Sequence, residues 1–343
     1  MMDITAPTPS RISSIFQEKA LPLYFGGAFL ISWIFWFIEP FLRSSDPVAA
    51  TFFIQFGTYG PVLAAMLVTA LGNRERTPAS LGRRLLAGGL ALAVAVYVNW
   101  LLFGHLLTSG AGAFDWVLAV IATLLPGWIF FNTNASLSGV RALLNPLTRW
   151  RTNPLWFAVA LLLMLTLSIL GVLLISLLSG QPLFGWTKAF MASESLRNLA
   201  LTLFATALYG GPVGEEAGWR GFALPRLQKR FDPLLASVWL GLAWGLWHLP
   251  LHVTGYYNQA FGDPLSGLLM RTFTTLPLTL IFTWLYNRTR GNLLVMVCLH
   301  TAVNVTSSLI APGTGLYITT TIAVVLMVVF DRMYRRTGNE VTA

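Results

Sequence analysis

The chain has 343 residues, of which 55% are hydrophobic and only 10% are charged. A soluble domain carries about 25% charged residues, so this composition indicates a protein built for lipid. The net charge of +9 is compatible with nucleic-acid binding. However, the basic residues lie in short clusters between apolar stretches without an aromatic-basic pattern, so we expect no nucleic-acid partner. The single cysteine, Cys298, excludes an intramolecular disulfide and a cysteine-based metal cluster.

Stretches of about 17–25 mainly apolar residues are long enough to cross a bilayer as helices. Ten segments meet this description in chain order: 21–38, 51–71, 85–107, 116–131, 155–178, 198–219, 234–251, 267–286, 291–311 and 316–332. The first lacks a well-placed small-residue cleavage site and is therefore interpreted as a span, not a signal peptide. Pro126-Gly127 interrupts the short fourth segment, so an alternative has nine crossings and a re-entrant fourth segment. The sequence predicts an all-α polytopic membrane protein with about ten transmembrane helices.

Ten crossings that start in the cytoplasm divide the 22 Lys and Arg residues very unevenly. Eighteen fall on the side of the N-terminus, and four fall on the other side: Arg43, Lys188, Arg197 and Arg271. Because cytoplasmic loops carry an excess of Lys and Arg, this division predicts that both termini are cytoplasmic. Nine crossings would scramble the division.

The domain organisation follows from the spans. The longest polar connectors, 132–154 and 179–197, are too short for a soluble domain. We expect a cytoplasmic N-terminal tail (1–20, disordered to about Ile15), N-terminal transmembrane helices (21–194), a membrane core that holds the chemistry (195–311), and a last transmembrane helix with a basic cytoplasmic tail (312–343).

The first polar motif of this core is Glu215-Glu216-Ala-Gly-Trp-Arg220. Ionisable side chains inside a bilayer cost about 2.5–3.5 kcal/mol each even on the gentler insertion scale, so they are rarely accidental. Residues four apart share a helix face, which predicts a charge pair between Glu216 and Arg220 and leaves Glu215 free to hold a water. The competing interpretation makes both glutamates interfacial charges at a helix end. Gly210-Gly211-Pro212, just before the motif, can kink or break the helix.

The second motif is Trp244-Gly-Leu-Trp-His248. If the preceding helix continues to Arg230 and the next begins near Leu234, Glu215 and His248 both lie about 21–22 Å from the inner end. The two side chains are therefore predicted to meet. The competing interpretation is a histidine that only forms hydrogen bonds between helices.

The third motif, His300-Thr-Ala-Val-Asn304, places an imidazole and an amide on one helix face. Both groups donate hydrogen bonds and could stabilise a developing oxyanion. Polar contact between helices is an equally good explanation of this pair taken alone.

Together the motifs resemble the signature of the CAAX protease and bacteriocin-processing family of intramembrane proteases, also called the Abi family. That signature is Glu-Glu-x-x-x-Arg, then Phe-x-x-x-His, then His-x-x-x-Asn, and here Trp244 replaces the usual Phe. The resemblance covers about residues 195–311. The strings GWRGFALPRLQKRF and WGLWHLPLH look like bacterial members, which implies a multi-pass protein of a bacterial cytoplasmic membrane.

The resemblance implies a CAAX prenyl protease 2-like hydrolase that cleaves peptide or membrane-protein substrates within the lipid. Glu215 with His248 would activate the attacking water, and His300 with Asn304 would stabilise the oxyanion. Glu216, Arg220 and Trp244 would support the site.

Family members are often labelled metalloproteases, and Glu215, His248 and His300 would make a plausible His₂Glu zinc site. We prefer a metal-free mechanism without a cofactor, because no His-Glu-x-x-His helix is present and Asn304 suits an oxyanion donor better than a zinc ligand. Two other classes remain open. One is a non-catalytic immunity or scaffold protein that binds a peptide, and the other is a proton-coupled transporter, against which the missing inverted repeat argues.

Overall fold

The computed structural model describes residues 11–108, 111–180, 198–257, 263–311 and 313–336. The described chain is helical, and its β structure is confined to one isolated bridge between Arg76 and Leu137. The elements are α1 (Arg11–Glu18), α2 (Ala20–Arg43), α3 (Pro47–Thr58), α4 (Gly60–Gly72), α5 (Leu81–Thr108), α6 (Ala113–Phe131), η1 (Asn132–Asn134), α7 (Ser138–Leu144), η2 (Asn145–Thr148), α8 (Pro154–Ser179), α11 (Leu199–Tyr209), α12 (Pro212–Gly218), the π-helical turn η3 (Trp219–Ala223), α13 (Leu224–Gln228), α14 (Pro233–Trp247), α15 (Leu249–Val253), α16 (Pro264–Arg288), α17 (Leu293–Leu309) and α18 (Thr314–Phe330).

Helix starts follow a local sequence signal. Four helices begin at an Asp-Pro or Asn-Pro dipeptide, in which the acid or amide caps the helix and proline occupies the first helical position. The capping oxygens accept hydrogen bonds of 2.8–3.0 Å from backbone N–H groups in α3, α8, α14 and α16; the caps are Asp46, Asn153, Asp232 and Asp263.

Six described helical segments are long and apolar enough to cross a membrane: Ala20–Arg43, Leu81–Gly104, Ala113–Asn134, Pro154–Ser179, Pro233–Val253 and Pro264–Arg288. A seventh is obtained if α3 and α4, bent by 45° at their junction, count as one span. The all-α polytopic membrane fold is therefore as expected, but the number of ten crossings is not confirmed.

The difference from ten comes from broken and short helices. The segment predicted at 198–219 is interrupted after Tyr209, and α17 and α18 have 17 residues each. Seventeen residues span about 25 Å, slightly less than the hydrocarbon thickness of about 30 Å. By contrast, α6 continues through Pro126 and passes the test of length and composition.

The N-terminal segment differs from the predicted tail. Residues 11–18 form helix α1, which packs against α4. The Ser13 hydroxyl and the Gln17 amide both donate hydrogen bonds of 2.6 Å to the carbonyl of Gly72. The expectation of disorder to Ile15 is therefore wrong from Arg11 onward, because these side chains anchor the segment to the carbonyl of Gly72 at the end of α4.

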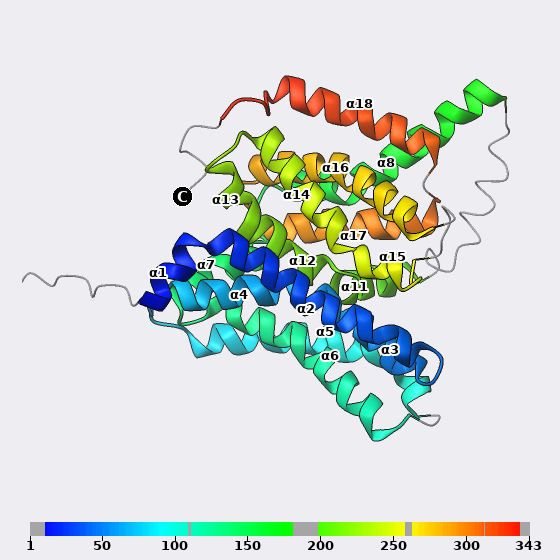
Figure 1. Cartoon of the computed structure of the whole chain (residues 1–343). Coiled ribbons are helices and arrows are strands. Elements are labelled where there is room, and N and C mark those ends of the chain that lie inside the picture. The colour runs from blue at the N-terminus through cyan, green and yellow to red at the C-terminus, as the bar shows by residue number, and fades with distance from the viewer. Residues whose placement is uncertain (1–10, 109–110, 181–197, 258–262, 312, 337–343) are drawn as a thin grey trace, which may run out of the picture.

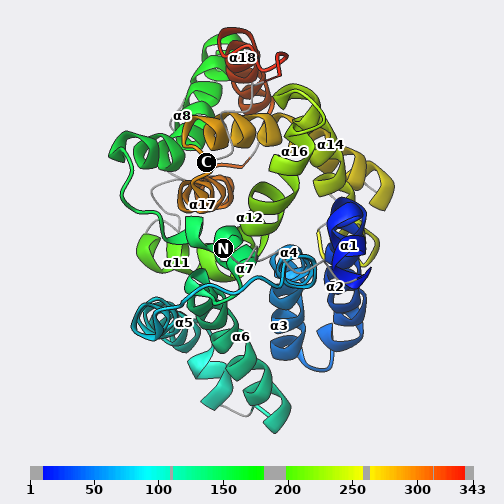
Figure 2. The ribbon, with the colours of Figure 1, turned by 90° about the vertical axis from the view of Figure 1, so that its left-hand side faces the viewer.

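Helix α12 lies in the middle of the bundle, packed between α4 and α17 (Figures 1 and 2). Gly214 and Gly218, one turn apart, permit this close packing. A Cβ atom at Gly214 would lie 2.5 Å from the carbonyl oxygen of Thr58, and one at Gly218 would lie 2.6 Å from Pro61. Small residues four apart allow membrane helices to approach closely. This spacing holds Glu215 and Glu216 at the centre of the protein.

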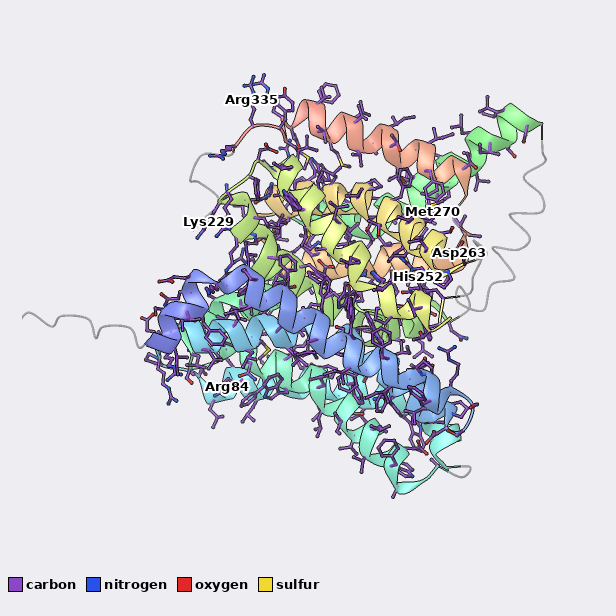
Figure 3. All side chains as sticks on the ribbon, viewed as in Figure 1. Arg84, Lys229, His252, Asp263, Met270 and Arg335 are labelled. Carbon is purple, nitrogen blue, oxygen red and sulfur yellow. The ribbon has the colours of Figure 1, made fainter. Side chains whose placement is uncertain are left out.

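Three basic residues counted on the inner side lie together in the structure. Arg84, Lys229 and Arg335 lie at one end of the bundle, whereas His252, Asp263 and Met270 lie at the other (Figure 3). Arg220, counted with the inner loop charges, is instead fully buried in the bundle. Lys188 and Arg197 lie outside the described residues.

Candidate active site

The backbone breaks immediately before Glu215. Helix α11 ends at Tyr209, and Gly211 has a φ of +114°, a conformation that favours glycine. A Cβ atom at Gly211 would also collide with Oε1 of Glu215, so two independent constraints require glycine here. The helix restarts at Pro212 and is helical through η3 and α13 to Gln228. The expected break is therefore present, and it lies beside the first carboxylate.

Glu215 is buried and is held by two indoles. Its Oε2 accepts hydrogen bonds from Nε1 of Trp244 at 2.8 Å and from Nε1 of Trp219 at 3.2 Å. Trp219 lies one turn further along the same helical stretch, and Trp244 comes from α14. Because both donors use one oxygen, the carboxylate is fixed while its Oε1 remains for another partner. The family resemblance implied only an unspecified supporting role for Trp244, and the sequence did not single out Trp219.

Glu216 forms the ion pair that the spacing predicted. Nη1 of Arg220 donates to Oε1 of Glu216 at 2.9 Å, and both side chains are fully buried. The same oxygen accepts from Nδ1 of His300 at 2.7 Å. The guanidinium also lies 4.4 Å from the ring centre of Trp244 and 3.9 Å from that of Phe282. Glu216 therefore joins the cation of its own helical stretch to the histidine of α17.

The hydrogen bonds fix the orientation of both histidines. Nδ1 of His248 lies 2.8 Å from the carbonyl oxygen of Trp244, and Nδ1 of His300 faces the Glu216 carboxylate. Carbonyl and carboxylate oxygens only accept, so both Nδ1 atoms carry hydrogen. Each neutral ring then has its lone pair on Nε2. His248 and His300 therefore both present an acceptor unless they are protonated.

Asn304 lies one turn beyond His300 on α17, on the same face. Its Nδ2 donates to the carbonyl oxygen of Gly210 at 3.0 Å, at the break that precedes Glu215. An amide nitrogen carries two hydrogens, so one remains for a further acceptor. This hydrogen bond connects α17 to the backbone at the break between α11 and α12.

One cavity of about 350 Å³ collects the four predicted catalytic residues, Glu215, His248, His300 and Asn304. Glu215 and His248 line it together, as their matched depths predicted. Glu216 and Arg220 do not line it and lie behind it instead. A second cavity of about 380 Å³ is lined by residues such as Phe16, Asn73 and Arg226 and contains no residue of this group.

Most of the residues that line the cavity were not singled out by the motifs, and a cation and a phenol are among them. Arg271 of α16 and Tyr257, in the loop after α15, both line the cavity with the predicted residues. Arg271 had been counted only as an outer charge. No short spacing connects it with Glu215 or His300, so only the packing of α16 against α14 brings it here.

The same geometry bears on a metal ion. Within the described residues, no group of three or more His, Cys, Asp or Glu side chains is placed to hold one. Oε2 of Glu215 is occupied by two indoles, and Nδ1 of His248 and of His300 is occupied by a carbonyl and a carboxylate. The ligand atoms left free are Oε1 of Glu215 and Nε2 of the two histidines. These three side chains do not form a metal-holding group in this arrangement, so no proposed step passes through a metal. The metal-free preference stays a prediction.

Comparison with known proteins identifies the segment that carries this site. A family model described as Rce1-like, type II CAAX prenyl endopeptidase, matches residues 197–306. The chain is also similar to CAAX prenyl protease 2 of Methanococcus maripaludis, with 30% identity over 146 residues that cover 41% of this chain and 53% of the relative. The chain thus spans about half the length of that relative. Residues 197–306, which carry all four predicted catalytic residues, are therefore similar to the type II CAAX prenyl endopeptidases.

Proposed function

We propose that this protein is an intramembrane endopeptidase that hydrolyses peptide bonds of membrane-associated peptides or proteins. One observation carries the proposal: a carboxylate, two imidazoles and an amide from three separate helical stretches line one cavity in an apolar bundle. Such groups are costly inside a membrane protein, and their convergence indicates a functional site. The similarity of residues 197–306 to CAAX prenyl endopeptidases and the name of the Methanococcus relative support proteolysis as that function.

Glu215 and His248 are the groups suited to activate water. The two indoles bind one carboxylate oxygen, which leaves Oε1 of Glu215 to accept a proton from water. Nε2 of His248 is an acceptor for the second hydrogen of the same water. As the water oxygen bonds to the peptide carbon, Glu215 takes the proton and then transfers it to the leaving amine when the C–N bond breaks.

Asn304 and His300 are the groups suited to the oxyanion. Asn304 retains one amide hydrogen after its bond to Gly210. His300 differs from the expectation that it donates in its neutral form, because its Nδ1 hydrogen is already given to Glu216. It donates from Nε2 only as an imidazolium, and Asn304 is therefore the donor that does not depend on protonation.

The Glu216–Arg220 pair supports these groups without touching the cavity. It holds the His300 ring by Nδ1, and its guanidinium stacks against Trp244, which binds Glu215. The pair thus connects the oxyanion side of the site with the base.

For the cellular setting, we propose a multi-pass protein of a bacterial cytoplasmic membrane with both termini in the cytoplasm. The positive-inside rule and the separation of charged ends in Figure 3 support this orientation.

The test compares membrane peptides from cells that make the unaltered protein with those from cells that make Glu215→Gln. A matched control is Glu18→Gln, which removes a carboxylate at an exposed position of α1. We expect fragments that depend on the unaltered protein and on Glu18→Gln and are absent with Glu215→Gln. Identical fragment sets in all three, with intact peptide co-purifying with the protein, would favour the peptide-binding scaffold instead.

A further inference from the structure

The catalytic cavity contains a cation that the proposed mechanism does not use. Arg271 lies in the second turn of α16, near the end of the bundle where Met270 is seen in Figure 3. It lines the cavity together with His248, His300 and Asn304. Its side chain is half-buried, and its positive charge acts on His248 and His252.

Among the described residues, Arg271 forms no ion pair. The two carboxylates of the site bind other groups: Oε2 of Glu215 accepts from two indoles, and Glu216 binds Arg220 and His300. Oε1 of Glu215 remains for the water of the proposed mechanism. Within the part of the chain that the structure describes, the guanidinium lies over the Tyr257 ring, whose centre is 4.5 Å away. Burial raises the pKa of the Tyr257 hydroxyl, so the ring is neutral and supplies a π face but no counter-charge.

A guanidinium in this setting is suited to bind one kind of group. Its planar fork matches a carboxylate with two parallel hydrogen bonds, and stacking on an aromatic ring fixes its plane. The cavity of about 350 Å³ is at the small end of ligand sites, so it accommodates only a short stretch of peptide. A carboxylate bound at Arg271 would therefore lie within a few residues of the bond that faces Glu215.

We propose that Arg271 binds a carboxylate of the substrate, and that the protein selects peptides whose scissile bond lies close to such a group. The carboxylate is either the free C-terminus of the peptide or an acidic side chain near the bond. This inference rests on the proposed function, because it assigns a substrate group to the same cavity.

Binding to the inactive Glu215→Gln protein tests the inference without requiring turnover. The full chain is reconstituted in vesicles of neutral lipid, and the probe is a fluorescent hydrophobic peptide in three forms: free acid, carboxamide, and carboxamide with one glutamate near the end. Each form is measured with Arg271 intact and with Arg271→Gln and Arg271→Lys. Arg43→Gln is the matched control, because Arg43 is a cation at the same end of the bundle that pairs with Glu39 and does not line the cavity.

We expect at least one carboxylate form to bind more tightly than the plain carboxamide, and Arg271→Gln to weaken that form by about 10- to 100-fold, as for loss of a hydrogen bond to a charged group. Arg271→Lys should retain part of this preference, and Arg43→Gln should retain all of it. Tight binding of the free acid alone assigns the C-terminus, and tight binding of the glutamate form alone assigns a side chain.

Three results overturn the inference: equal or undetectable binding of all three forms, equal weakening of all three by Arg271→Gln, or a preference that appears only when anionic lipid is added. Equal weakening would make Arg271 a structural or electrostatic support, and the lipid result would make it a phosphate contact. Failure of the proposed function would be seen separately, as unaltered cleavage by Glu215→Gln.

Discussion

Replacing Trp244 with Phe removes one hydrogen bond and leaves most of an aromatic ring in place. In this protein, Nε1 of Trp244 donates to Glu215 at 2.8 Å, while its ring lies 5.5 Å from the His300 ring and 4.4 Å from the Arg220 guanidinium. Phe is the usual residue at this position of the family signature. The substitution therefore tests what the indole N–H adds in this chain.

The expected loss follows from the strength of the bond. A hydrogen bond to a charged group contributes about 1.5–3 kcal/mol, which corresponds to about 10- to 100-fold in rate if it is fully felt in the transition state. Trp219 still donates to the same oxygen at 3.2 Å, so the lower part of this range is expected. We predict that kcat falls about 10-fold, with KM changed by less than about threefold, because the peptide itself has lost no contact.

The assay measures kcat, KM and the thermal unfolding midpoint of the purified protein with a cleavable membrane peptide. Trp239→Phe is the matched control, because Trp239 lies on the same helix with 51% of its surface exposed and lines no part of the cavity. A Trp244→Phe protein with unchanged kcat would refute the idea that this indole positions Glu215. A large fall in unfolding midpoint beside the loss of kcat would show that the effect is structural.

Three further outcomes follow. Glu216→Gln should lower thermal stability more than Glu215→Gln does, because it leaves the fully buried Arg220 without its charge partner. Breaking a buried ion pair in this way costs about 3–5 kcal/mol. Equal unfolding midpoints of the two variants would argue against a supporting role for Glu216 and a catalytic role for Glu215. The purified protein should carry less than about one tightly bound zinc per chain by elemental analysis, since no dedicated zinc-helix motif is present; stoichiometric zinc, with activity lost to a chelator and restored by zinc, would overturn this. In a Cys298→Ser background, Lys229→Cys should not be labelled by a membrane-impermeant thiol reagent in intact cells, because its loop is predicted to be cytoplasmic. Labelling would show that the orientation is the opposite of the proposed one.

Local rules recovered much of the site. Spacing of four residues predicted the Glu216–Arg220 pair. Counting residues from the helix ends placed Glu215 and His248 at one depth, which agrees with their positions around one cavity. Both follow from regular helix geometry, which continues from Pro212 to Gln228 although η3 adds a π-helical turn. The glycine break was also visible, because Pro and Gly act on the backbone locally.

Other features depend on packing between distant segments. His300 lies 84 residues after Glu216, and their hydrogen bond changes which form of the ring can donate. The indole of Trp244 reaches Glu215 only because α14 and α12 pack in one relative rotation, which periodicity does not specify. Arg271 is a further example. The division of charges predicted which end of the bundle Arg271 occupies but not that its side chain lines the cavity.

Hydropathy predicted more continuous transmembrane helices than the structure contains, for a related reason. An apolar window does not distinguish a continuous span from two helices joined at a break. The segments 51–71 and 198–219 both read as single spans, yet the first bends by 45° and the second is interrupted at Gly210. The second break lies beside the candidate catalytic carboxylate, where departures from local regularity are expected.

Glu215 is proposed to be the base of a membrane-embedded peptidase. The most direct measurement compares the cleavage rate of one identified peptide by purified, reconstituted protein and by Glu215→Gln, with Glu18→Gln as the control. We expect a rate lower by about 10²–10⁴ for Glu215→Gln, with an unfolding midpoint close to that of the unaltered protein. Full cleavage by folded Glu215→Gln protein would contradict it.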